Sequence, residues 1–428
     1  MTQPVPESFP SLPALMADIG RRARAAASAL AIAPPEARTA ALMAMAERLR
    51  SAEGPVLDAN AEDVAVAAAA GLAPALIDRL TLGAKGVAAV ADAIEAIAAQ
   101  PDPLGAETAR WTPANGLDIA RVRTPIGVLA VIYESRPNVT AEAAALCLRS
   151  GNAVILRPGS DALKTSRAIH AALAEGLAAA GLPADAVQIV PTADREAVGE
   201  MLKGLDGAVD LVIPRGGKSL VERVKAEARV PVLGHLEGVC HTFVHCAADP
   251  QKARDIVLNA KMRRVSVCGA TETLLVDGAA AEQLLPPIAE ALDAAGCELR
   301  GDAAARRIWP DMGEAMEEDW RTEYLAPILA VRVVGGVDGA VEHIRTYGSG
   351  HTDAIVTEDR DAAERFLGAV DSAIVLWNAS TQFADGGEFG FGGEIGISTS
   401  KLHARGPVGA EQLTSYKYVV RGSGQVRT

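Results

Sequence analysis

Apolar positions repeat with a helical period through the first hundred residues of the chain. The segment 36–50 shows the pattern best, with one stripe at i, i+3, i+4 and i+7. The stripe consists of Leu42, Met45, Ala46 and Leu49. Alanine-rich segments of the same kind continue to about residue 100, so we expect this region to be all-helical. The first dozen residues carry three prolines and predict a loose tail.

The period changes after this region, where short β-branched runs alternate with amphipathic ones. The runs that we interpret as strands are Gly127–Ile132, Ala153–Leu156, Val187–Val190, Val209–Ile213, Thr242–His245, Thr273–Val276, Ala330–Val334, Ala354–Val356 and Ala373–Leu376. Buried apolar strands that alternate with helices predict right-handed βαβ crossovers. The expected fold class is therefore α/β, with parallel sheets covered on both faces.

Two segments far apart in the sequence depart from this pattern. Gly116–Thr124 and Gln412–Val420 alternate polar and apolar residues, as half-exposed antiparallel strands do. The two could pair with each other and leave an edge for a second subunit to cover. We therefore expect a homo-oligomer.

Length and charge narrow the class of protein. A chain of 428 residues with 49% hydrophobic and 22% charged residues has the composition of a folded protein of two or three domains. Its formal net charge is −13 and it has no dense basic stripe, which argues against nucleic acid and anionic membranes as partners. The longest apolar uncharged run near the start, Val64–Ile77, is shorter than the roughly 18 to 20 residues of a membrane span. The opening residues lack a basic leader, so we expect a cytoplasmic location.

The cysteines and histidines predict neither disulfides nor a metal centre. The five cysteines, Cys147, Cys240, Cys246, Cys268 and Cys297, include no CxxC pair, which favours a reducing compartment. His241 and His245 have a spacing seen in metal sites, but the intervening residues indicate a strand and no third ligand is evident. We therefore expect no metal site.

Cys268 is the strongest candidate nucleophile. Asp249 and Pro250 predict the capped start of a helix, after which Lys261, Arg263 and Arg264 cluster just ahead of Cys268. A thiol on a turn beside cations ionises more easily, and the thiolate is the reactive form. The alternative is that Cys268 is a small buried hydrophobe, as most lone cysteines are.

Asn138 stands between an expected strand and a helix over 139–150. It could be an ordinary helix N-cap. It could equally place a side-chain amide where it donates a hydrogen bond to a developing oxyanion. The local pattern leaves both interpretations open.

Five motifs carry a resemblance over nearly the whole chain. They are YESRPNVT at Tyr133–Thr140, LRPGSDA at Leu156–Ala162, GHLEGVCH at Gly234–His241, VCGATET at Val267–Thr273 and GEIGISTSKLHARGPVG at Gly393–Gly409. On these the chain resembles the aldehyde dehydrogenase superfamily, and within it the branch that reduces γ-glutamyl phosphate to glutamate 5-semialdehyde in proline biosynthesis. The resemblance implies a helical N-terminal region with an NADP-binding domain over 1–238, a catalytic domain over 239–377, and a return to the cofactor domain over 378–428. Segments 116–124 and 412–420 would form a small oligomerisation element.

The resemblance also implies roles for individual residues. Cys268 matches the nucleophile and Asn138 the oxyanion-hole asparagine. The residues matched to binding of the cofactor, NADP(H), are Arg157, Pro158, Ser160, Lys164, Arg215, Gly216, Gly217 and Glu323. Of these, Arg215–Gly217 would face the diphosphate and Glu323 the nicotinamide-side ribose. Candidates for holding the amino-acid part of the substrate are Glu134 for its ammonium and Arg136, Arg264, Ser398 and Thr399 for anionic groups.

Two departures from the family pattern bear on the reaction. His235 replaces the glutamate that activates hydrolytic water in ordinary aldehyde dehydrogenases, which fits a thioester that is reduced rather than hydrolysed; Glu237 could instead be a displaced base. Ser160 is neutral and Arg157 is close by, so a 2′-phosphate should be tolerated.

Several points stay open at this stage. The proton donor is unassigned, since His235 could equally be a packed neutral histidine. Glutamate 5-kinase is a possible partner that would hand over the acyl phosphate. The alternatives are an NAD-linked dehydrogenase that oxidises a small aldehyde, a coenzyme A-dependent relative, and a catalytically silent scaffold.

Overall fold

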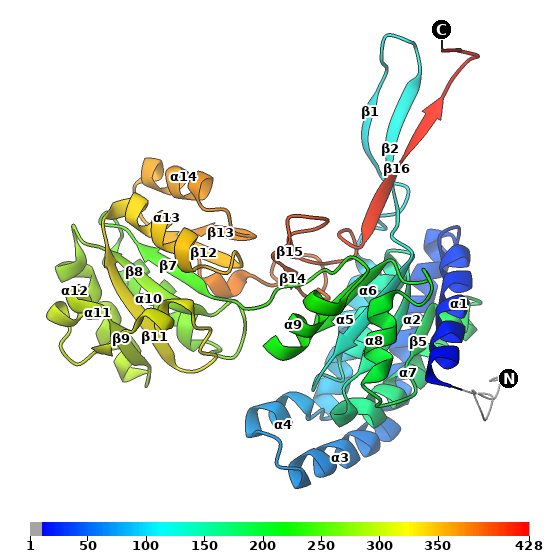
Figure 1. Cartoon of the computed structure of the whole chain (residues 1–428), viewed down its shortest axis with the longest axis horizontal. Coiled ribbons are helices and arrows are strands. Elements are labelled where there is room, and N and C mark those ends of the chain that lie inside the picture. Colours follow the sequence, from blue (N-terminus) through cyan, green and yellow to red (C-terminus); the bar gives the residue numbers. More distant parts are fainter. Residues whose placement is uncertain (1–10, 428) are drawn as a thin grey trace. The chain divides into compact units, whose positions relative to one another are not determined.

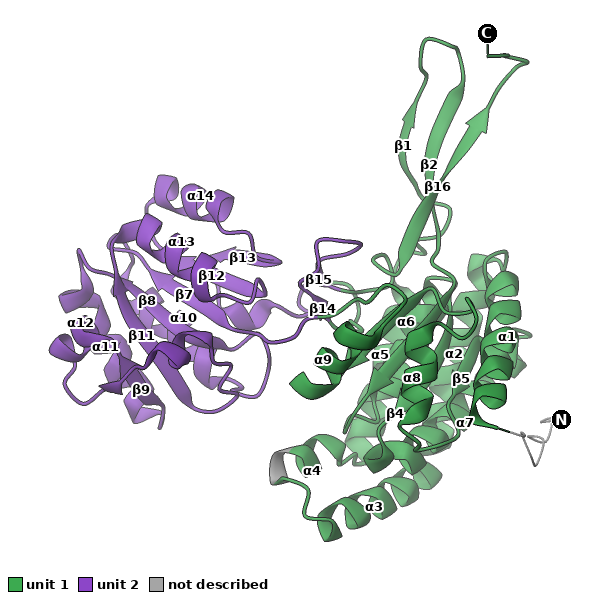
Figure 2. Ribbon diagram, in the orientation of Figure 1, with its two compact units in different colours: residues 1–234, 390–396, 408–428 green, residues 235–389, 397–407 purple. Residues whose placement is uncertain are grey.

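The computed structural model describes residues 11–427, except the side chains of residues 74 and 75, and divides them into two compact units (Figure 2). Unit 1 comprises the chain up to Gly234 together with Gly390–Gly396 and the segment from Val408 onward, and unit 2 comprises His235–Phe389 and Ile397–Pro407. The chain thus enters unit 2 and returns from it twice. The expected tail lies outside the described residues, except for its last two positions, where Ser11 caps the first helix.

Unit 1 begins with the five helices that the apolar stripes predicted. They are α1 (Leu12–Leu30), α2 (Pro35–Ser51), α3 (Glu53–Ala69), α4 (Pro74–Leu80) and α5 (Ala84–Ala99). The predicted stripe of α2 is buried, with Leu42 and Met45 fully covered. The all-helical N-terminal region is confirmed over the residues described.

A parallel sheet follows in unit 1, in the order β5-β4-β3-β6. Its strands are β3 (Val128–Tyr133), β4 (Ala153–Pro158), β5 (Val187–Ile189) and β6 (Leu211–Arg215). The connecting helices are α6 (Val139–Arg149), α7 (Leu163–Ala179) and α8 (Glu196–Lys203), and α9 (Lys218–Glu227) follows β6. The chain moves outward from β3 to β5 and then crosses back to the other side of β3. This reversal places a ligand-binding position at the carboxyl ends of β3 and β6.

The second sheet of unit 1 joins two segments that lie almost three hundred residues apart (Figure 1). β2 (Asp118–Pro125) pairs antiparallel with β16 (Thr414–Arg421), from Asp118 opposite Arg421 to Pro125 opposite Thr414. This confirms the pairing predicted from the alternating patterns. On its other side β2 pairs with β1 (Glu107–Trp111), a strand that the sequence analysis did not identify.

Unit 2 contains a seven-stranded parallel sheet in the order β10-β9-β11-β8-β7-β12-β13. The strands are β7 (Cys240–Val244), β8 (Thr271–Asp277), β9 (Glu298–Gly301), β10 (Gly313–Glu314), β11 (Ile328–Val334), β12 (Thr352–Val356) and β13 (Ile374–Trp377). Its helices are α10 (Pro250–Met262), α11 (Ala281–Ala294), α12 (Ala303–Ile308), α13 (Gly336–Tyr347) and α14 (Arg360–Ala369). A short antiparallel pair, β14 (Ile397–Ser398) and β15 (Gly406–Pro407), completes the unit.

Two large apolar clusters, with a smaller one at Ile374, Ala384 and Ile397, form the core of unit 2. One contains residues of α10, α11 and the strands from β8 to β11, and the other packs α13 and α14 around Phe243, Leu275 and Phe366. Helices thus contribute to both clusters, which confirms the α/β prediction. Every strand that we predicted overlaps an observed one, whereas β9, β10, β14 and β15 were missed because they are short and lack an apolar run. No helix among the described residues is long and apolar enough to cross a membrane.

Candidate active site

Cys268 lies between the end of α10 and the start of β8, at the amino-terminal edge of the unit 2 sheet. The helix that leads to it begins as the sequence predicts: the carboxylate of Asp249 accepts a hydrogen bond from the backbone N–H of Lys252 at 2.8 Å, and Pro250 occupies the first turn. Cys268 is partly exposed, whereas the residues that follow it in β8 are buried. Cys268 therefore sits where the buried sheet meets the surface of unit 2.

Two imidazoles accompany this thiol. The metal-ligating atoms of His235, Cys268 and His351 all lie within 4.8 Å of one another, and the two rings meet edge to face with centroids 4.9 Å apart. Nδ1 of His235 lies 2.8 Å from the carbonyl oxygen of Ile397 and must donate to it, because a carbonyl only accepts. His351 is fully buried and its Nδ1 lies 2.9 Å from the hydroxyl of Thr352, while its Nε2 has no hydrogen-bond partner.

The imidazoles control ionisation of the thiol. Burial of Cys268 by itself would raise its pKa, but the charges and hydrogen bonds of His351 and His235 outweigh it and hold the pKa well below its usual value. The sequence analysis expected a lowered pKa but attributed it to nearby cations. That attribution is corrected for two of them, because Lys261 is fully buried in an ion pair with Glu272 and Arg263 donates from Nε to Gln382 at 3.0 Å.

Close packing fixes the backbone of Cys268. A Cβ added to Gly238 would lie 2.1 Å from the carbonyl oxygen of Cys268, so only glycine fits here. The thiol of Cys240 donates to that same oxygen at 3.1 Å. Burial raises the pKa of Cys240 well above its usual value, which keeps it protonated as a donor.

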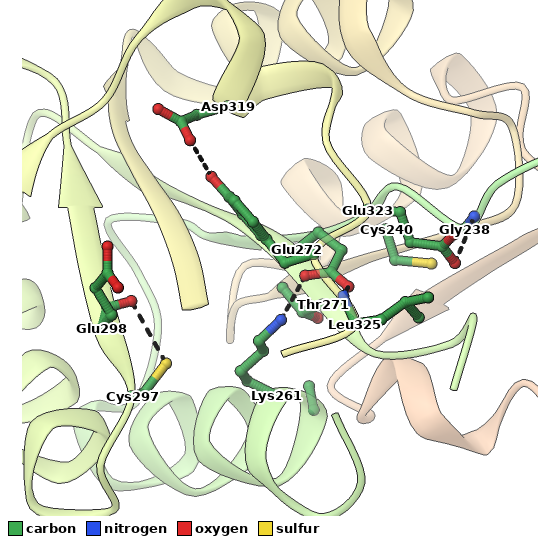
Figure 3. Close-up of polar contacts among 12 residues, drawn as sticks. Gly238, Cys240, Lys261, Thr271, Glu272, Cys297, Glu298, Asp319, Glu323 and Leu325 are labelled. Carbon is green, nitrogen blue, oxygen red and sulfur yellow. Dashed lines mark hydrogen bonds and ion pairs between the residues drawn. The ribbon is translucent and has the colours of Figure 1, made fainter. Parts of the chain in front are cut away.

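Figure 3 shows Glu323 and Glu272 beside this packing contact. A carboxylate oxygen of Glu323 accepts from the N–H of Gly238 at 3.0 Å. Burial raises the pKa of Glu323, and the negative charge of Cys268 acts in the same direction. Burial likewise raises the pKa of Glu272 to about 7, although Lys261 opposes the shift. Glu323 is thus placed in the Cys268 neighbourhood.

The substrate-binding candidates of unit 2 differ in their surroundings. Ser398 is fully buried and follows Ile397, the residue that His235 contacts; its hydroxyl accepts from the N–H of Ser400 at 3.2 Å. Thr399 is partly exposed. Arg264 is exposed, and its backbone carbonyl accepts a hydrogen bond from the side-chain amide of Gln382 at 3.3 Å.

Asn138 stands at the start of α6 in unit 1 and is partly exposed. Its backbone is already helical and its side chain does not cap the helix, so the N-cap interpretation is wrong. The amide instead donates to Oε1 of Glu142 at 2.9 Å. The side-chain amide that could donate to an oxyanion is thus bound to the carboxylate of Glu142, one helical turn further along.

The cofactor candidates after β4 are held by neighbouring loops. Arg157 is buried and its Nη2 donates to the carbonyl of Ala193 at 2.9 Å, while its Nε lacks a partner. Burial lowers the pKa of this guanidinium. Pro158 ends β4, and Ser160 is exposed at the next turn. Lys164 is also exposed and forms an ion pair with Glu62 at 2.7 Å.

The candidates after β6 occupy the point where the strand order reverses. Gly216 and Gly217 are exposed between Arg215 and α9, and no side chain caps this helix. A Cβ on Gly216 would lie 2.7 Å from the carboxylate of Glu134, whose backbone N–H donates to the carbonyl of Arg215 at 3.1 Å. Arg215 carries a buried Nε without a partner.

The structure therefore gathers the predicted residues into two groups. Glu134 and the half-buried Arg136 join Asn138 and the residues after β4 and β6 in unit 1, whereas Cys268 and Glu323 lie in unit 2. Sequence reasoning missed His351, Gly238 and Cys240 as neighbours of Cys268. The motif GHLEGVCH contains two of them, but nothing local in the sequence distinguishes His351 from a structural histidine.

Comparisons with known proteins agree with this arrangement. Residues 14–303 match the model of the aldehyde dehydrogenase family. The chain is 68% identical to the gamma-glutamyl phosphate reductase of Caulobacter sp. (strain K31), over 97% of this chain and 100% of that protein, and 68% identical to the one of Caulobacter vibrioides, over 96% and 100%. The crystal structure of gamma-glutamyl phosphate reductase from Thermotoga maritima superposes with a TM-score of 0.94 at 44% identity, over 96% of this chain and 100% of that chain.

Proposed function

The chain belongs to the aldehyde dehydrogenase family and, within it, to the γ-glutamyl phosphate reductases, and we propose that its reaction passes through a thioester on Cys268. It is an oxidoreductase that reduces γ-glutamyl phosphate to glutamate 5-semialdehyde and releases phosphate, in proline biosynthesis. The observation that carries the proposed path is the pair of imidazoles that hold the pKa of Cys268 low. The lowered pKa favours the thiolate, which is the nucleophilic form.

In the first step the Sγ of Cys268 bonds to the acyl carbon, and phosphate leaves with the electron pair of the broken C–O bond. The tetrahedral oxyanion receives hydrogen bonds from the backbone N–H of Cys268 and from the amide of Asn138. For this, Asn138 gives up its present contact with Glu142. Because Gly238 and Cys240 hold the carbonyl of Cys268, the orientation of the Cys268 peptide is set in advance.

In the second step the thioester is reduced and the thiolate departs as the aldehyde forms. His235 and His351 stabilise the departing sulfur as they stabilise the resting thiolate. Since His235 stands where a hydrolytic glutamate would stand, water is not activated at the thioester.

The protein uses a nicotinamide cofactor, and we propose NADP(H). The cofactor supplies the hydride that reduces the thioester. The residues after β6 fit its diphosphate, because Gly216 and Gly217 leave the start of α9 open and the Nε of Arg215 lacks a partner. We assign the nicotinamide-side ribose to Glu323.

The adenosine end is assigned to the turn after β4. Arg157, Pro158, Ser160 and Lys164 would surround its ribose. Ser160 is neutral and exposed, so no carboxylate there would repel a 2′-phosphate, and Arg157 supplies a nearby cation whose Nε has no hydrogen-bond partner. These features support NADPH over NADH.

Substrate binding is divided among the remaining candidates. We assign the anionic groups of the substrate to Arg136, Arg264, Ser398 and Thr399, and its ammonium to Glu134. The burial of Ser398 next to the carbonyl that orients His235 supports its assignment. In the expected division into domains, residues 1–238 and 378–428 bind the cofactor and residues 239–377 carry the chemistry.

We further propose that the sheet β1-β2-β16 joins copies of this chain. Trp111, Tyr416, Tyr418 and Val420 are exposed, and the ring of Tyr418 meets that of Trp111 at 5.9 Å and that of Tyr416 at 5.7 Å. An exposed aromatic face on a three-stranded sheet is typical of an interaction surface.

The cellular setting is also a proposal. Five free cysteines fit the reducing conditions of the cytoplasm. An acyl phosphate is labile in water, which favours direct delivery by glutamate 5-kinase. The coupled activity of kinase and reductase should persist when a phosphatase that cleaves acyl phosphates is added, whereas its loss would show that the intermediate diffuses freely.

The test of the main proposal is oxidation of glutamate 5-semialdehyde with NADP, with and without inorganic phosphate. The expected result is strict dependence on phosphate, with acid quenching in its absence trapping a glutamyl adduct on Cys268. Formation of glutamate without phosphate would support a hydrolytic dehydrogenase instead. A competent wild-type protein that never shows the adduct would contradict the thioester path.

A further inference from the structure

A second cluster of potential ligands lies at the opposite edge of the unit 2 sheet from Cys268. His245 follows β7, Asp277 ends β8, and Cys246 comes directly after His245. One ligating atom from each residue lies within 4.8 Å of the other two. We propose that these three side chains bind a divalent zinc-type metal ion, outside the site described above.

The distances fit tetrahedral coordination. Zn–S and Zn–N bonds of about 2.3 Å and about 2.0–2.1 Å at a tetrahedral angle place sulfur and nitrogen about 3.6 Å apart. The Sγ of Cys246 lies 3.5 Å from Nε2 of His245. Oδ2 of Asp277 lies 3.7 Å from the same nitrogen, a few tenths of an ångström beyond the value of about 3.3–3.4 Å that bound oxygen would have.

Surrounding groups orient the ligands as outer contacts do in metal sites. Nδ1 of His245 lies 2.9 Å from the hydroxyl of Thr357 and can also accept from the N–H of Ala247, at the longer distance of 3.4 Å. Metal binding selects the tautomer in which Nδ1 donates to Thr357 and Nε2 keeps its lone pair. The carboxylate of Asp277 accepts from the backbone N–H of Cys246 at 3.2 Å and from that of Ala279 at 3.1 Å.

The position in the fold also favours a ligand. β7, β8 and β12 are neighbours in the sheet, and the cluster with Thr357 follows their carboxyl ends (Figure 1). The strand order of this sheet reverses at β7, where open α/β sheets bind ligands. His245 and Asp277 are buried whereas Cys246 is exposed, so an ion can enter from solvent and keep a water as its fourth ligand.

The sequence spacing suggested a different pair. His241 and His245 are four residues apart on an extended strand, which places them about 13 Å apart. Nδ1 of His241 instead lies 2.8 Å from Oδ1 of Asp353, in a buried pair. The third ligand that the sequence could not show is Asp277, which the parallel pairing of β7 with β8 brings beside His245.

Each metal ion that binds displaces one proton, from the thiol of Cys246. Because the ion binds the folded chain and ties the ends of β7 and β8 together, it should raise the thermal midpoint of unfolding. This inference does not depend on the proposed reaction, since none of its ligands contacts Cys268 in the described structure.

Cobalt(II) is the probe for the test, because a bound thiolate gives a charge-transfer band. The titration uses the full chain with Cys268→Ser, which removes the thiolate of the His235–Cys268–His351 cluster. We expect one equivalent of cobalt to produce the band and raise the thermal midpoint. Adding Cys246→Ser should abolish both effects, whereas the matched control Cys297→Ser should preserve them.

Two further variants separate binding from folding. Thr357→Val should weaken cobalt binding by about 10- to 100-fold, and His245→Gln by more, since it removes a direct ligand. The metal-free thermal midpoint of the Cys246→Ser chain should match its parent, because Cys246 is exposed. Absence of the band in the Cys268→Ser chain, or its persistence after Cys246→Ser, would overturn the proposal.

Discussion

Lys261 and Glu272 form an ion pair from which solvent is fully excluded (Figure 3), and Cys268 lies between these two residues in the sequence. Lys261 lies in the last turn of α10 and Glu272 in β8, so the pair closes the loop that holds the thiol. The second carboxylate oxygen of Glu272 also accepts from the N–H of Leu325, at 3.3 Å, two residues beyond Glu323. One buried carboxylate thus connects both segments that flank the site.

This pair should make the stability of the protein depend on pH. The folded pKa of Glu272, about 7, lies above its ordinary value of 4.5, so folding favours its protonated form. The resulting stability is present below about pH 4.5 and is lost as the pH rises through about 7, by an amount on the order of 3 kcal/mol. Urea unfolding from pH 5 to pH 8 should show this decline.

The matched control removes both charges at once. A single substitution would leave one buried ion without its partner. The double variant Lys261→Met, Glu272→Gln avoids this by removing both charges. Its free energy of unfolding should change less with pH than that of the parent over the same range. Identical slopes for the two chains would contradict the assignment of the titration to Glu272.

Cys268 should react with alkylating agents under mildly acidic conditions. An ordinary thiol with a pKa of about 8.5 slows about tenfold for each pH unit below that value. Because His351 and His235 hold the pKa of Cys268 low, its rate should fall less between about pH 8 and about pH 6 than that of an ordinary thiol. Peptide mass spectrometry after brief iodoacetamide treatment measures the rate at each cysteine.

Cys246 of the same protein is the comparison thiol, and His351→Ala is the test variant. Partial desolvation and the neighbouring carboxylate of Asp277 raise the pKa of Cys246, so its alkylation should fall steeply over this range. His351→Ala should move the profile of Cys268 toward that of Cys246. An unchanged profile in this variant would exclude His351 as a cause of the low pKa.

Gly238→Ala should impair both stability and catalysis. The new methyl group would lie 2.1 Å from the carbonyl oxygen of Cys268, so the loop must move. Forced overpacking of this kind typically costs about 1–3 kcal/mol, and displacement of the Cys268 peptide should lower kcat. Gly368→Ala is the control, because nothing lies within 4 Å of a Cβ there and its helical position favours alanine. Equal kcat in the two variants would contradict the packing argument.

Asn138→Ala should reduce kcat by about 100- to 1000-fold, the usual effect of losing one oxyanion donor. Cofactor binding, followed by quenching of protein fluorescence, should remain nearly unchanged. Glu142→Gln tests the present contact of the amide separately, since it removes the charge that Asn138 now faces while keeping an acceptor. Full activity in the Asn138→Ala variant would show that the amide does not stabilise the oxyanion.

Tyr418→Lys should shift the protein from an oligomer toward a monomer, as measured by light scattering after gel filtration. The substitution places a charge at the centre of the aromatic contacts of β1 and β16. Lys417→Ser, at the adjacent position of the same strand, should leave the oligomer intact, since successive side chains point to opposite faces. A monomeric wild-type protein would contradict the proposed interface.

The sequence by itself determined the elements of this protein and its family. Apolar periodicity located the N-terminal helices and the long strands, and alternation in two distant segments predicted that β2 would pair with β16. The family resemblance carried by five motifs predicted Cys268 as the nucleophile, whereas the local pattern around it left a structural role open. Short strands such as β10 were missed, since two residues cannot show a period.

Only the tertiary structure decided what surrounds the reactive side chains. Strand pairing brings His351 to Cys268 and Asp277 to His245, across large distances in sequence that no local pattern records. The lowered pKa of Cys268 follows from those imidazoles, whereas Lys261 and Arg263 are engaged by Glu272 and Gln382. Ionisation depends on the charges and burial around a group, and these are fixed by how the sheet is assembled.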